Sequence, residues 1–492
     1  MRINSQGSFP EVFVSTTETS REVSRAAARG RLRKLASRLY TNNFADTPED
    51  IVKRHIWPIV AGYFPGALIA DRTALELMPA KDGSVCIIAN SSIEKVVPGL
   101  IIRPRIGIGP LPQDRPFLGD GLYLSAKARA YLENMRATRI RGGRVARTLG
   151  AQDVENRLET IISRSGEMEV NRLRDEIGSI APFLGLEAES ARLSSIIGAM
   201  LGTRDAVLQS SSGKARRAGL PYDSNRLDLF QQLHSALHAS APKSIIPKPR
   251  SPSQKSVLAF FEAYFSNFIE GTEFPLDEAE GIIFDGYIPD DRPDDAHDIL
   301  GTFQLAATPG DWDPTMATAS EFIGRLKICN AEIMGARPEK RPGNFKTRVN
   351  QAGMSLFVEP ELVEGTLRQG HALLRSLETP FQRAVFTMFL VSEVHPFADG
   401  NGRTARIMMN SELSAAGEER IIIPTVYRDN YVAALKALTH NSSPTQLIRT
   451  LDFAWRWTAA IDWENIKAAT KQLHATNAFA DNDDIVRLKL PD

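Results

Sequence analysis

A helix–loop–helix pattern between residues 379 and 417 restricts the fold of this chain more than any other stretch. Thr379 and Pro380 suit the cap and first turn of a helix, and apolar residues then recur at helical spacing. A second helix is expected from Asn401 to Ala416, with Gly417 placed to end it. The loop between the two helices runs into the second one and reads HPFADGNGRTAR over residues 395–406.

The second half of this loop has the features of an anion site. Gly400-Asn401-Gly402 lies just before the predicted helix, where unpaired backbone N–H groups and the helix dipole favour an anion. Glycine lets the backbone approach that anion closely. Arg403 and Arg406 are three residues apart, so they share a helix face and both can reach phosphate oxygens.

The first half of the loop adds groups for metal binding and proton transfer. Asp399 is a hard oxygen ligand beside a phosphate site, which suits Mg²⁺. His395 is the nearby group whose ordinary pKa suits proton abstraction near neutral pH. A lone DGNG is most often a turn, and an arginine pair on a helix is usually solvated. The full combination indicates nucleotide phosphate chemistry with a histidine base.

HPFADGNGRTAR resembles the signature of the Fic family, HxFx(D/E)GNGRxxR, at every defined position. The resemblance implies a helical bundle that transfers AMP from ATP to a hydroxyl group of a target protein, with Mg²⁺ as cofactor. Retention of the second glycine favours AMP transfer over the phosphorylation of the related Doc kinases. The implied roles are His395 as base, Asp399 for Mg²⁺, Gly400, Asn401 and Gly402 as phosphate cradle, Arg403 for the β/γ region and Arg406 for the γ-phosphate.

The segment 342–360 predicts a β-hairpin that turns near Asn350–Gly353. It resembles the Fic flap, which pairs with an extended segment of the target by adding a strand. The alternative is an ordinary surface hairpin. The docking residues implied by the resemblance are Phe345, Thr347 and Val349.

The segment 253–271 predicts an amphipathic helix with Ser253 as its cap. Ser266 and Glu270 are four residues apart, and the stretch resembles the (S/T)xxxE(G/N) motif of Fic proteins with an inhibitory helix. The resemblance implies that Glu270 pairs with Arg406 and inhibits the enzyme. A glutamate at this place can also position water, so removal of AMP from a modified target is a second implied activity.

The first half of the chain is basic. Residues 1–250 carry a net charge of +11 and residues 251–492 a net charge of −11, which suggests two units with different partners. Residues 15–135 weakly resemble AbiEi-type antitoxin and regulator domains, which have a winged helix, although only one helix, 15–29, has room before the wing. The residues expected to contact DNA phosphates are Arg25, Arg29, Arg31, Arg33 and Lys34. The alternative is a solvated basic helix, or one that docks on the acidic half.

The expected fold is mainly α: a Fic-type bundle with a β-hairpin flap, preceded by a smaller α/β, winged-helix-like region and a helical middle segment. Short strands are expected at 31–44, 85–88 and 100–106. The expected domains are a basic α/β domain (1–140), a helical segment (141–238), a linker (239–253), a Fic domain with its inhibitory helix (254–475, helix 254–271) and a tail (476–492).

Composition is ordinary for a globular protein. The two cysteines, Cys86 and Cys329, are too distant to form a zinc motif, and they fit a reducing compartment. With no signal peptide or membrane span recognisable in the sequence, a cytoplasmic location is expected. The expected partners are ATP, a target protein and DNA, and a homodimer stays open. The main alternative function is a DNA-binding regulator whose Fic half senses nucleotide without turnover.

Overall fold

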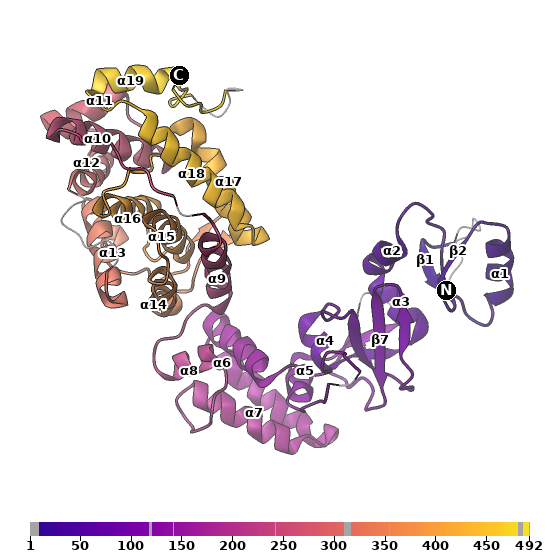
Figure 1. Ribbon diagram of the computed structural model, residues 1–492. Coiled ribbons are helices and arrows are strands. Elements are labelled where there is room, and N and C mark those ends of the chain that lie inside the picture. Colours follow the sequence, from indigo (N-terminus) through magenta and orange to yellow (C-terminus); the bar gives the residue numbers. More distant parts are fainter. Residues whose placement is uncertain are drawn as a thin grey trace. The chain divides into compact units, whose positions relative to one another are not determined.

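The computed structural model describes residues 9–117, 121–140, 142–241, 243–308, 316–353, 355–480 and 486–491. The chain forms two compact units, a first unit of residues 1–217 and a second unit of residues 218–492. The mainly helical fold with small sheets agrees with the prediction (Figure 1). Among the described residues, no helix combines the length and the apolar character needed to cross a membrane.

The first unit begins with a small antiparallel sheet and one helix. The helix α1 is shorter than predicted, and strands β2 and β3 fall where short strands were expected. The sheet has the order β1-β3-β2. With a single helix before the hairpin, this part confirms the α/β prediction, whereas the resemblance to AbiEi-type domains stays a prediction. The elements are β1 (Val12–Val14), α1 (Ser20–Ala28), β2 (Arg33–Ala36) and β3 (Leu39–Thr41).

A six-stranded mixed sheet and a helical segment complete the first unit. The strand order is β6-β7-β5-β4-β9-β8, and β5 and β7 confirm the two strands predicted here. Its elements are α2 (Pro48–Arg54), α3 (Ile56–Tyr63), β4 (Ala67–Ile69), α4 (Asp71–Glu76), β5 (Ser84–Ile88), β6 (Lys95–Val97), β7 (Leu100–Arg105), β8 (Arg115–Pro116), β9 (Leu122–Leu124), α5 (Lys127–Asn134), α6 (Ala151–Leu184, broken at Gly166), α7 (Glu187–Met200) and α8 (Ser211–Arg217).

The second unit is a helical bundle. Its helices are α9 (Ser224–His238), α10 (Pro252–Ile269), α11 (Leu276–Glu280), α12 (Pro293–Ala307), α13 (Ala319–Ile333), α14 (Val363–Leu374), α15 (Pro380–Val394), α16 (Asn401–Ala415), α17 (Arg428–Asn441), α18 (Pro444–Ala460) and α19 (Ile466–Ala475). Short helical turns lie at Gly281–Asp285, Pro338–Lys340, Pro360–Leu362 and Thr425–Tyr427. The small hairpin consists of β10 (Gln351–Ala352) and β11 (Ser355–Leu356).

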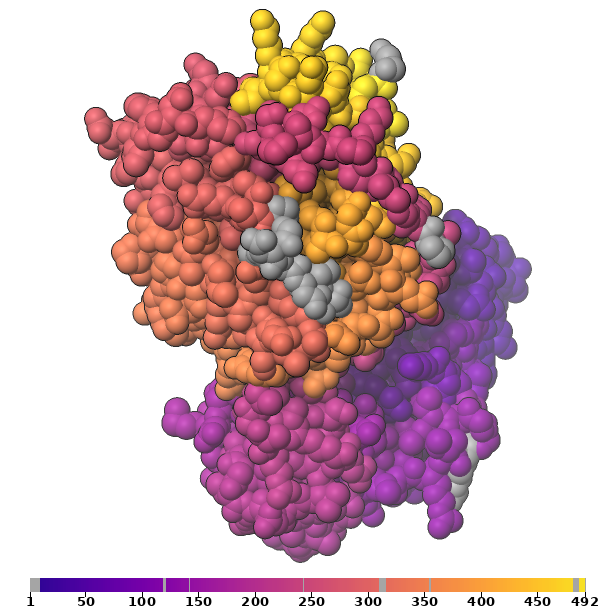
Figure 2. All heavy atoms as spheres, turned by 60° about the vertical axis from the view of Figure 1, so that its left-hand side comes forward, coloured from indigo at the N-terminus to yellow at the C-terminus, as the bar shows by residue number. Residues whose placement is uncertain are grey.

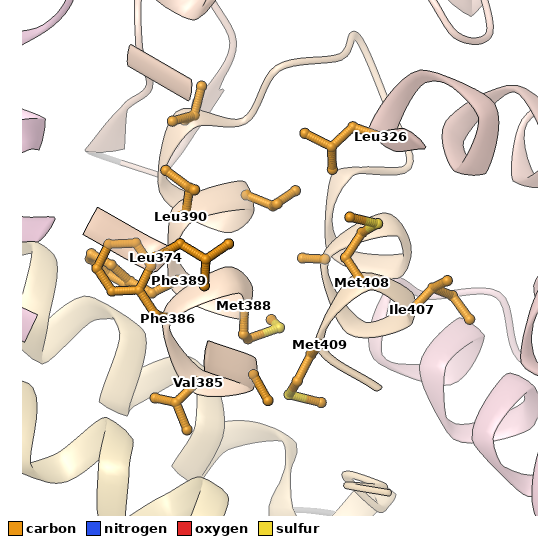
Figure 3. Packing of buried hydrophobic residues seen from close by; sticks show 14 of the residues in the cluster. Leu326, Leu374, Val385, Phe386, Met388, Phe389, Leu390, Ile407, Met408 and Met409 are labelled. Atoms are coloured by element: carbon orange, nitrogen blue, oxygen red, sulfur yellow. The ribbon is translucent and has the colours of Figure 1, made fainter. Parts of the chain in front are cut away.

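The core of the second unit lies around α15 and α16. Met388 on α15 points toward Met409 on α16, whereas Phe386 and Phe389 lie on the other side of α15, where Phe230 of α9 packs on them (Figure 3). The predicted start of α15 is confirmed, because the Thr379 side chain accepts a hydrogen bond from the Gln382 N–H and forms a capping box. This core holds fixed the ends of the two helices from which the predicted loop projects.

The position of the domain boundary differs from the prediction. The division falls between Arg217 and Ala218 and not at the proline-rich segment, because α9 packs into the second unit. The Phe230 ring of α9 lies 6.1 Å from that of Phe386 and 6.0 Å from that of Phe389.

The segment that follows α9 lies on the surface of the second unit (Figure 2). Arg250 forms an ion pair with Glu419, and the Ile245 carbonyl accepts a hydrogen bond from the Glu419 N–H. Helix α10 then begins at Pro252, and its cap is Ser251 and not Ser253 as predicted. The predicted linker (239–253) is therefore a surface segment of the second unit and does not connect two units.

The predicted tail, residues 476–492, is partly packed. Leu488 is buried, and the Lys489 N–H donates to the Thr476 carbonyl. The DNDD sequence at 481–484 lies outside the described residues.

Candidate functional site

The loop between α15 and α16 is closed by two residues of the predicted motif. The Asn401 side chain accepts from the Phe397 N–H at 2.8 Å and donates to the Phe397 carbonyl at 2.9 Å. Phe397 is 1% exposed and contributes to the core. The side chain of Asn401 therefore shapes the loop, and what it can offer an anion is its backbone N–H.

The residues predicted to cradle an anion lie at the N-terminus of α16. Gly400 has φ of 75°, and a side chain there would collide with Met334. The N–H groups in the first turn of a helix have no acceptor within that helix, and the helix dipole adds positive potential. The Gly400 N–H itself donates to Asp399 Oδ1 at 2.7 Å.

His395 ends α15 in a left-handed conformation, with φ of 51°. Its imidazole stacks on Phe357, with the ring centroids 3.8 Å apart and an angle of 10° between the planes. Nδ1 lies 3.3 Å from the Ser392 carbonyl oxygen, which can only accept, so Nδ1 carries a proton and Nε2 is free. Burial, with help from the nearby Lys346 charge, lowers the pKa of His395 to about 4. The imidazole is therefore neutral near pH 7.

Asp399 is the group available for a metal ion. Its side chain is 46% exposed, and Oδ2 lies 3.8 Å from the Lys340 ammonium. The described residues contain no group of three or more acidic, histidine or cysteine ligands. Mg²⁺ often takes one or two carboxylates and completes its coordination with phosphate and water, so a single exposed carboxylate beside the cradle fits this ion.

Arg403 is buried and held by groups that the sequence analysis did not identify. Its Nη1 lies 2.6 Å from Asp298 Oδ2 on α12 and 3.1 Å from Asn267 Oδ1 on α10. Asp298 also accepts from Arg337 at 3.1 Å. An acidic residue more than a hundred positions upstream carries no local pattern that would have indicated this contact.

Arg406 contacts Glu270, with which the resemblance implied a pair, and also Ser266 of the same motif. Its Nη2 lies 2.7 Å from Glu270 Oε1 and 2.7 Å from the Ser266 carbonyl, while Nε donates to Ser266 Oγ at 2.9 Å. The Glu270 side chain is 32% exposed and that of Arg406 only 5%. A side chain at Gly402 would overlap the Glu270 carboxylate, which therefore lies at the cradle itself.

The predicted docking residues lie beside this site. The hairpin is confirmed but short, and Met354 lies outside the described residues. Phe345 packs on Phe397 with ring centroids 5.8 Å apart, whereas Thr347 is exposed and Val349 is half-buried. All three line a groove of about 390 Å³ together with Lys340 and Arg341.

The predicted DNA-contacting residues lie in the first unit. Arg25 is exposed on α1 and Arg29 directly after its end, whereas Val23 and Ala26 of this helix are buried. Arg31 and Lys34 are also exposed, and Arg33 donates to the Asp46 carbonyl. Within the described residues, no ion pair involves any of these five cations.

Residues 324–413 match the sequence profile of the Fic/DOC family. This segment is a Fic/DOC domain. It contains the hairpin, α14, α15 and α16 up to Leu413, and it excludes α10 with Glu270. The match confirms the resemblance drawn from the loop sequence for this part of the chain.

Curated relatives match over part of their length. Protein adenylyltransferase fic-1 of Caenorhabditis elegans is 32% identical over 181 residues, 36% of either chain. Protein adenylyltransferase Fic of Nematostella vectensis is 25% identical over 245 residues, 47% of this chain and 56% of the relative. The chain thus spans about a third to a half of the length of these relatives.

Solved Fic structures also align with the chain. Fic-1 (residues 134–508) from C. elegans aligns with 18% identity and a TM-score of 0.35, over 65% of this chain and 88% of that one. IbpAFic2 in complex with adenylylated Cdc42 aligns with 14% identity and a TM-score of 0.33, over 62% and 88%.

Proposed function

We propose that this protein is an adenylyltransferase that transfers AMP from ATP to a hydroxyl group of a target protein. The observation that carries the proposal is the assembly of the complete motif at one place, with His395 and Asp399 directly before the N-terminus of α16. The names of the curated relatives support the same activity.

The reaction needs a base and an anion site. His395 Nε2 takes the proton of the target hydroxyl while Nδ1 donates to Ser392, so the imidazole needs no reorientation. The hydroxyl oxygen forms a bond to the α-phosphorus of ATP, and the bond from this phosphorus to the pyrophosphate oxygen breaks. The cradle at Gly400–Gly402 and the dipole of α16 hold the phosphates during this step.

Asp399 is the residue that would hold Mg²⁺. When bound there, the ion neutralises phosphate charge and supports the departure of pyrophosphate. The Asp399 side chain already lies against the Gly400 N–H, so the same residue orders the start of the cradle. ATP is the expected nucleotide because the two motif arginines provide charge for a triphosphate.

Glu270 is the proposed inhibitory residue. Its carboxylate pairs with Arg406 and occupies the space that a Cβ on Gly402 would take, at the proposed phosphate site. An anion already present in the cradle competes with the nucleotide, and it also occupies the Arg406 guanidinium. The protein should therefore be restrained until Glu270 moves.

The test uses label transfer from α-labelled ATP to the proteins of a lysate. Glu270→Gly should increase labelling by roughly 5- to 150-fold, the range of typical coupling energies. Glu273→Gly, an exposed glutamate three residues further on, is the matched control and should leave labelling unchanged. The double variant Glu270→Gly/His395→Ala should abolish it. Equal labelling by the wild type and Glu270→Gly would contradict the inhibitory role.

Removal of AMP is a second activity of the same site. The Glu270 carboxylate is partly exposed beside the cradle, so it can orient a water molecule toward a bound phosphoryl group. Proteins labelled by Glu270→Gly should then lose their label on incubation with wild type but not with Glu270→Gln. Retention of the label with both proteins would rule out this activity.

DNA binding through the first unit is a further candidate function. The observation that favours it is the group of cations at α1 and the hairpin of β2 and β3, for which the described part of the chain shows no ion pair. Salt-dependent binding of a DNA duplex should weaken on raising NaCl from about 50 to 200 mM. DNA binding should be lost in Arg25→Glu/Arg29→Glu and retained in His395→Ala. The His395→Ala variant also separates an enzyme from a nucleotide-sensing regulator, because it should abolish label transfer in an enzyme while DNA binding remains. Binding that does not respond to salt would contradict it.

A cytoplasmic location also stays a proposal. It is supported by the two cysteines, which are both buried and unpaired.

A further inference from the structure

Lys346 contacts the backbone on both sides of His395. Its N–H donates to the Pro396 carbonyl at 2.9 Å, and its Nζ donates to the Val394 carbonyl at 3.3 Å. The residue is only 5% exposed, so its ammonium group lies inside the protein. A buried lysine is rare unless a specific contact holds it, and here the contact is with the residues that flank the base.

Phe357 approaches His395 from the other stem of the same hairpin. Its ring covers the imidazole, and its N–H donates to the Asn350 carbonyl at 3.2 Å. Asn350 in turn donates to the Phe397 carbonyl at 2.7 Å. Both stems of the hairpin therefore touch the motif loop.

The conformation of His395 requires such support. A left-handed conformation is unfavourable for a residue other than glycine, and it persists where the surroundings over-determine it. The carbonyls of Val394 and Pro396 determine the direction of the chain at this residue. Both are bound by Lys346, so loss of this side chain would free the Val394 carbonyl.

Charged groups act on both members of this pair. Lys346, Glu270 and Asp399 act on His395, while Glu359 and Arg226 act on Lys346. Burial lowers the pKa of Lys346 to about 7. Near His395, a positive charge on Lys346 disfavours the imidazolium form and keeps the base ready to accept a proton.

We propose that Lys346 is a positioning residue that fixes His395 and links it to the flap. The hairpin at 342–360, the predicted flap, would then bind the target segment and also orient His395, which takes the proton of the target hydroxyl. Its meaning for catalysis rests on the proposed AMP transfer, but the contact itself does not.

An NMR titration of the full chain tests the contact without any activity. Histidines labelled with ¹³C at Cε1 are titrated in wild type, Lys346→Met, Lys346→Arg and the matched control Arg348→Met, with His395→Ala to assign the signal. Lys346→Met should move the pKa of His395 toward its ordinary value of about 6.5 and shift its Cε1 signal. Lys346→Arg and Arg348→Met should leave the pKa near that of the wild type. An unchanged His395 in Lys346→Met would overturn the proposal.

The kinetic arm uses the Glu270→Gly background. Lys346→Met should lower kcat for label transfer by about tenfold and leave KM for ATP unchanged. This loss is part of the ~10²–10⁴-fold rate increase that a general base supplies. Lys346→Arg should restore kcat. If Lys346→Met fails to fold, the Lys346→Arg titration decides, because a His395 pKa raised despite the retained charge would contradict the positioning role. If Glu270→Gly shows no transfer, the proposed function fails while the titration still decides on Lys346.

Discussion

Replacing Asp298 by asparagine measures how strongly Arg403 is held. Asp298 is 1% exposed and lies 2.6 Å from Arg403 and 3.1 Å from Arg337. Asp298→Asn keeps the shape but leaves two guanidinium groups without their shared carboxylate. Breaking a buried ion pair from one side costs about 3–5 kcal/mol. Because Asn267 still accepts from Arg403, we expect the lower end, about 3 kcal/mol.

Glu270→Gln is the matched comparison, since it removes the charge from the other arginine partner. The Glu270 side chain is one third exposed, and Arg406 keeps both of its bonds to Ser266. A partly exposed pair contributes about 1 kcal/mol or less. The free energy of unfolding should therefore fall about 2 kcal/mol further in Asp298→Asn than in Glu270→Gln.

Urea unfolding followed by tryptophan fluorescence can resolve this difference. Trp455, Trp457 and Trp463 are fully buried in the second unit, so a large part of the signal reports on the unit that holds both pairs. Equal midpoints for the two variants would refute the reasoning that burial decides the strength of these pairs. In the Glu270→Gly background, Asp298→Asn should also raise KM for ATP, because Arg403 loses its orientation.

Three further predictions concern pH, metal and stability. Since the pKa of His395 is about 4, label transfer by Glu270→Gly should not decline between about pH 8 and pH 5 and should fall only near pH 4. A pH profile of label transfer with its midpoint near 6.5 would contradict the assignment of the buried His395 as the base. Chelation by EDTA should abolish this transfer and added Mg²⁺ restore it, and Asp399→Asn should require more Mg²⁺ for half-maximal rate. Between about pH 7 and 10.5, Lys346 binds more protons in the unfolded chain than in the folded one. The free energy of unfolding should therefore rise with pH in this range, and the rise should be smaller in Lys346→Met.

Features set by neighbouring residues could be predicted from the sequence. The Thr379 cap, the glycine turn before α16 and the end of that helix depend on backbone chemistry within a few positions. The contact between Glu270 and Arg406 was also expected, because the resemblance to Fic proteins with an inhibitory helix implies this pair.

Features set by tertiary packing could not be predicted in this way. Asp298 contacts Arg403 because α12 packs beside α16, and nothing in the sequence near Asp298 indicates this neighbour. Nothing in the sequence near Lys346 indicates that its side chain is buried against the residues that flank His395. The proline-rich segment suggested a domain boundary, whereas the apolar face of α9 decided where the unit begins.

The position of Glu270 at the end of α10 also limits how inhibition can be relieved. Phe260, Phe261 and Phe265 of this helix are fully buried, and Glu262 binds Asn410 and Arg420 inside the unit. Exposing three phenylalanines alone would require about 5–9 kcal/mol, which is comparable to the whole stability of a typical domain. Release of the entire helix would thus unfold the catalytic unit. Glu270, by contrast, follows the last helical turn, is partly exposed and precedes Gly271 with φ of 88°. Relief of inhibition should therefore be a local movement of the Glu270 side chain and the turn at Gly271, with the body of α10 kept in place.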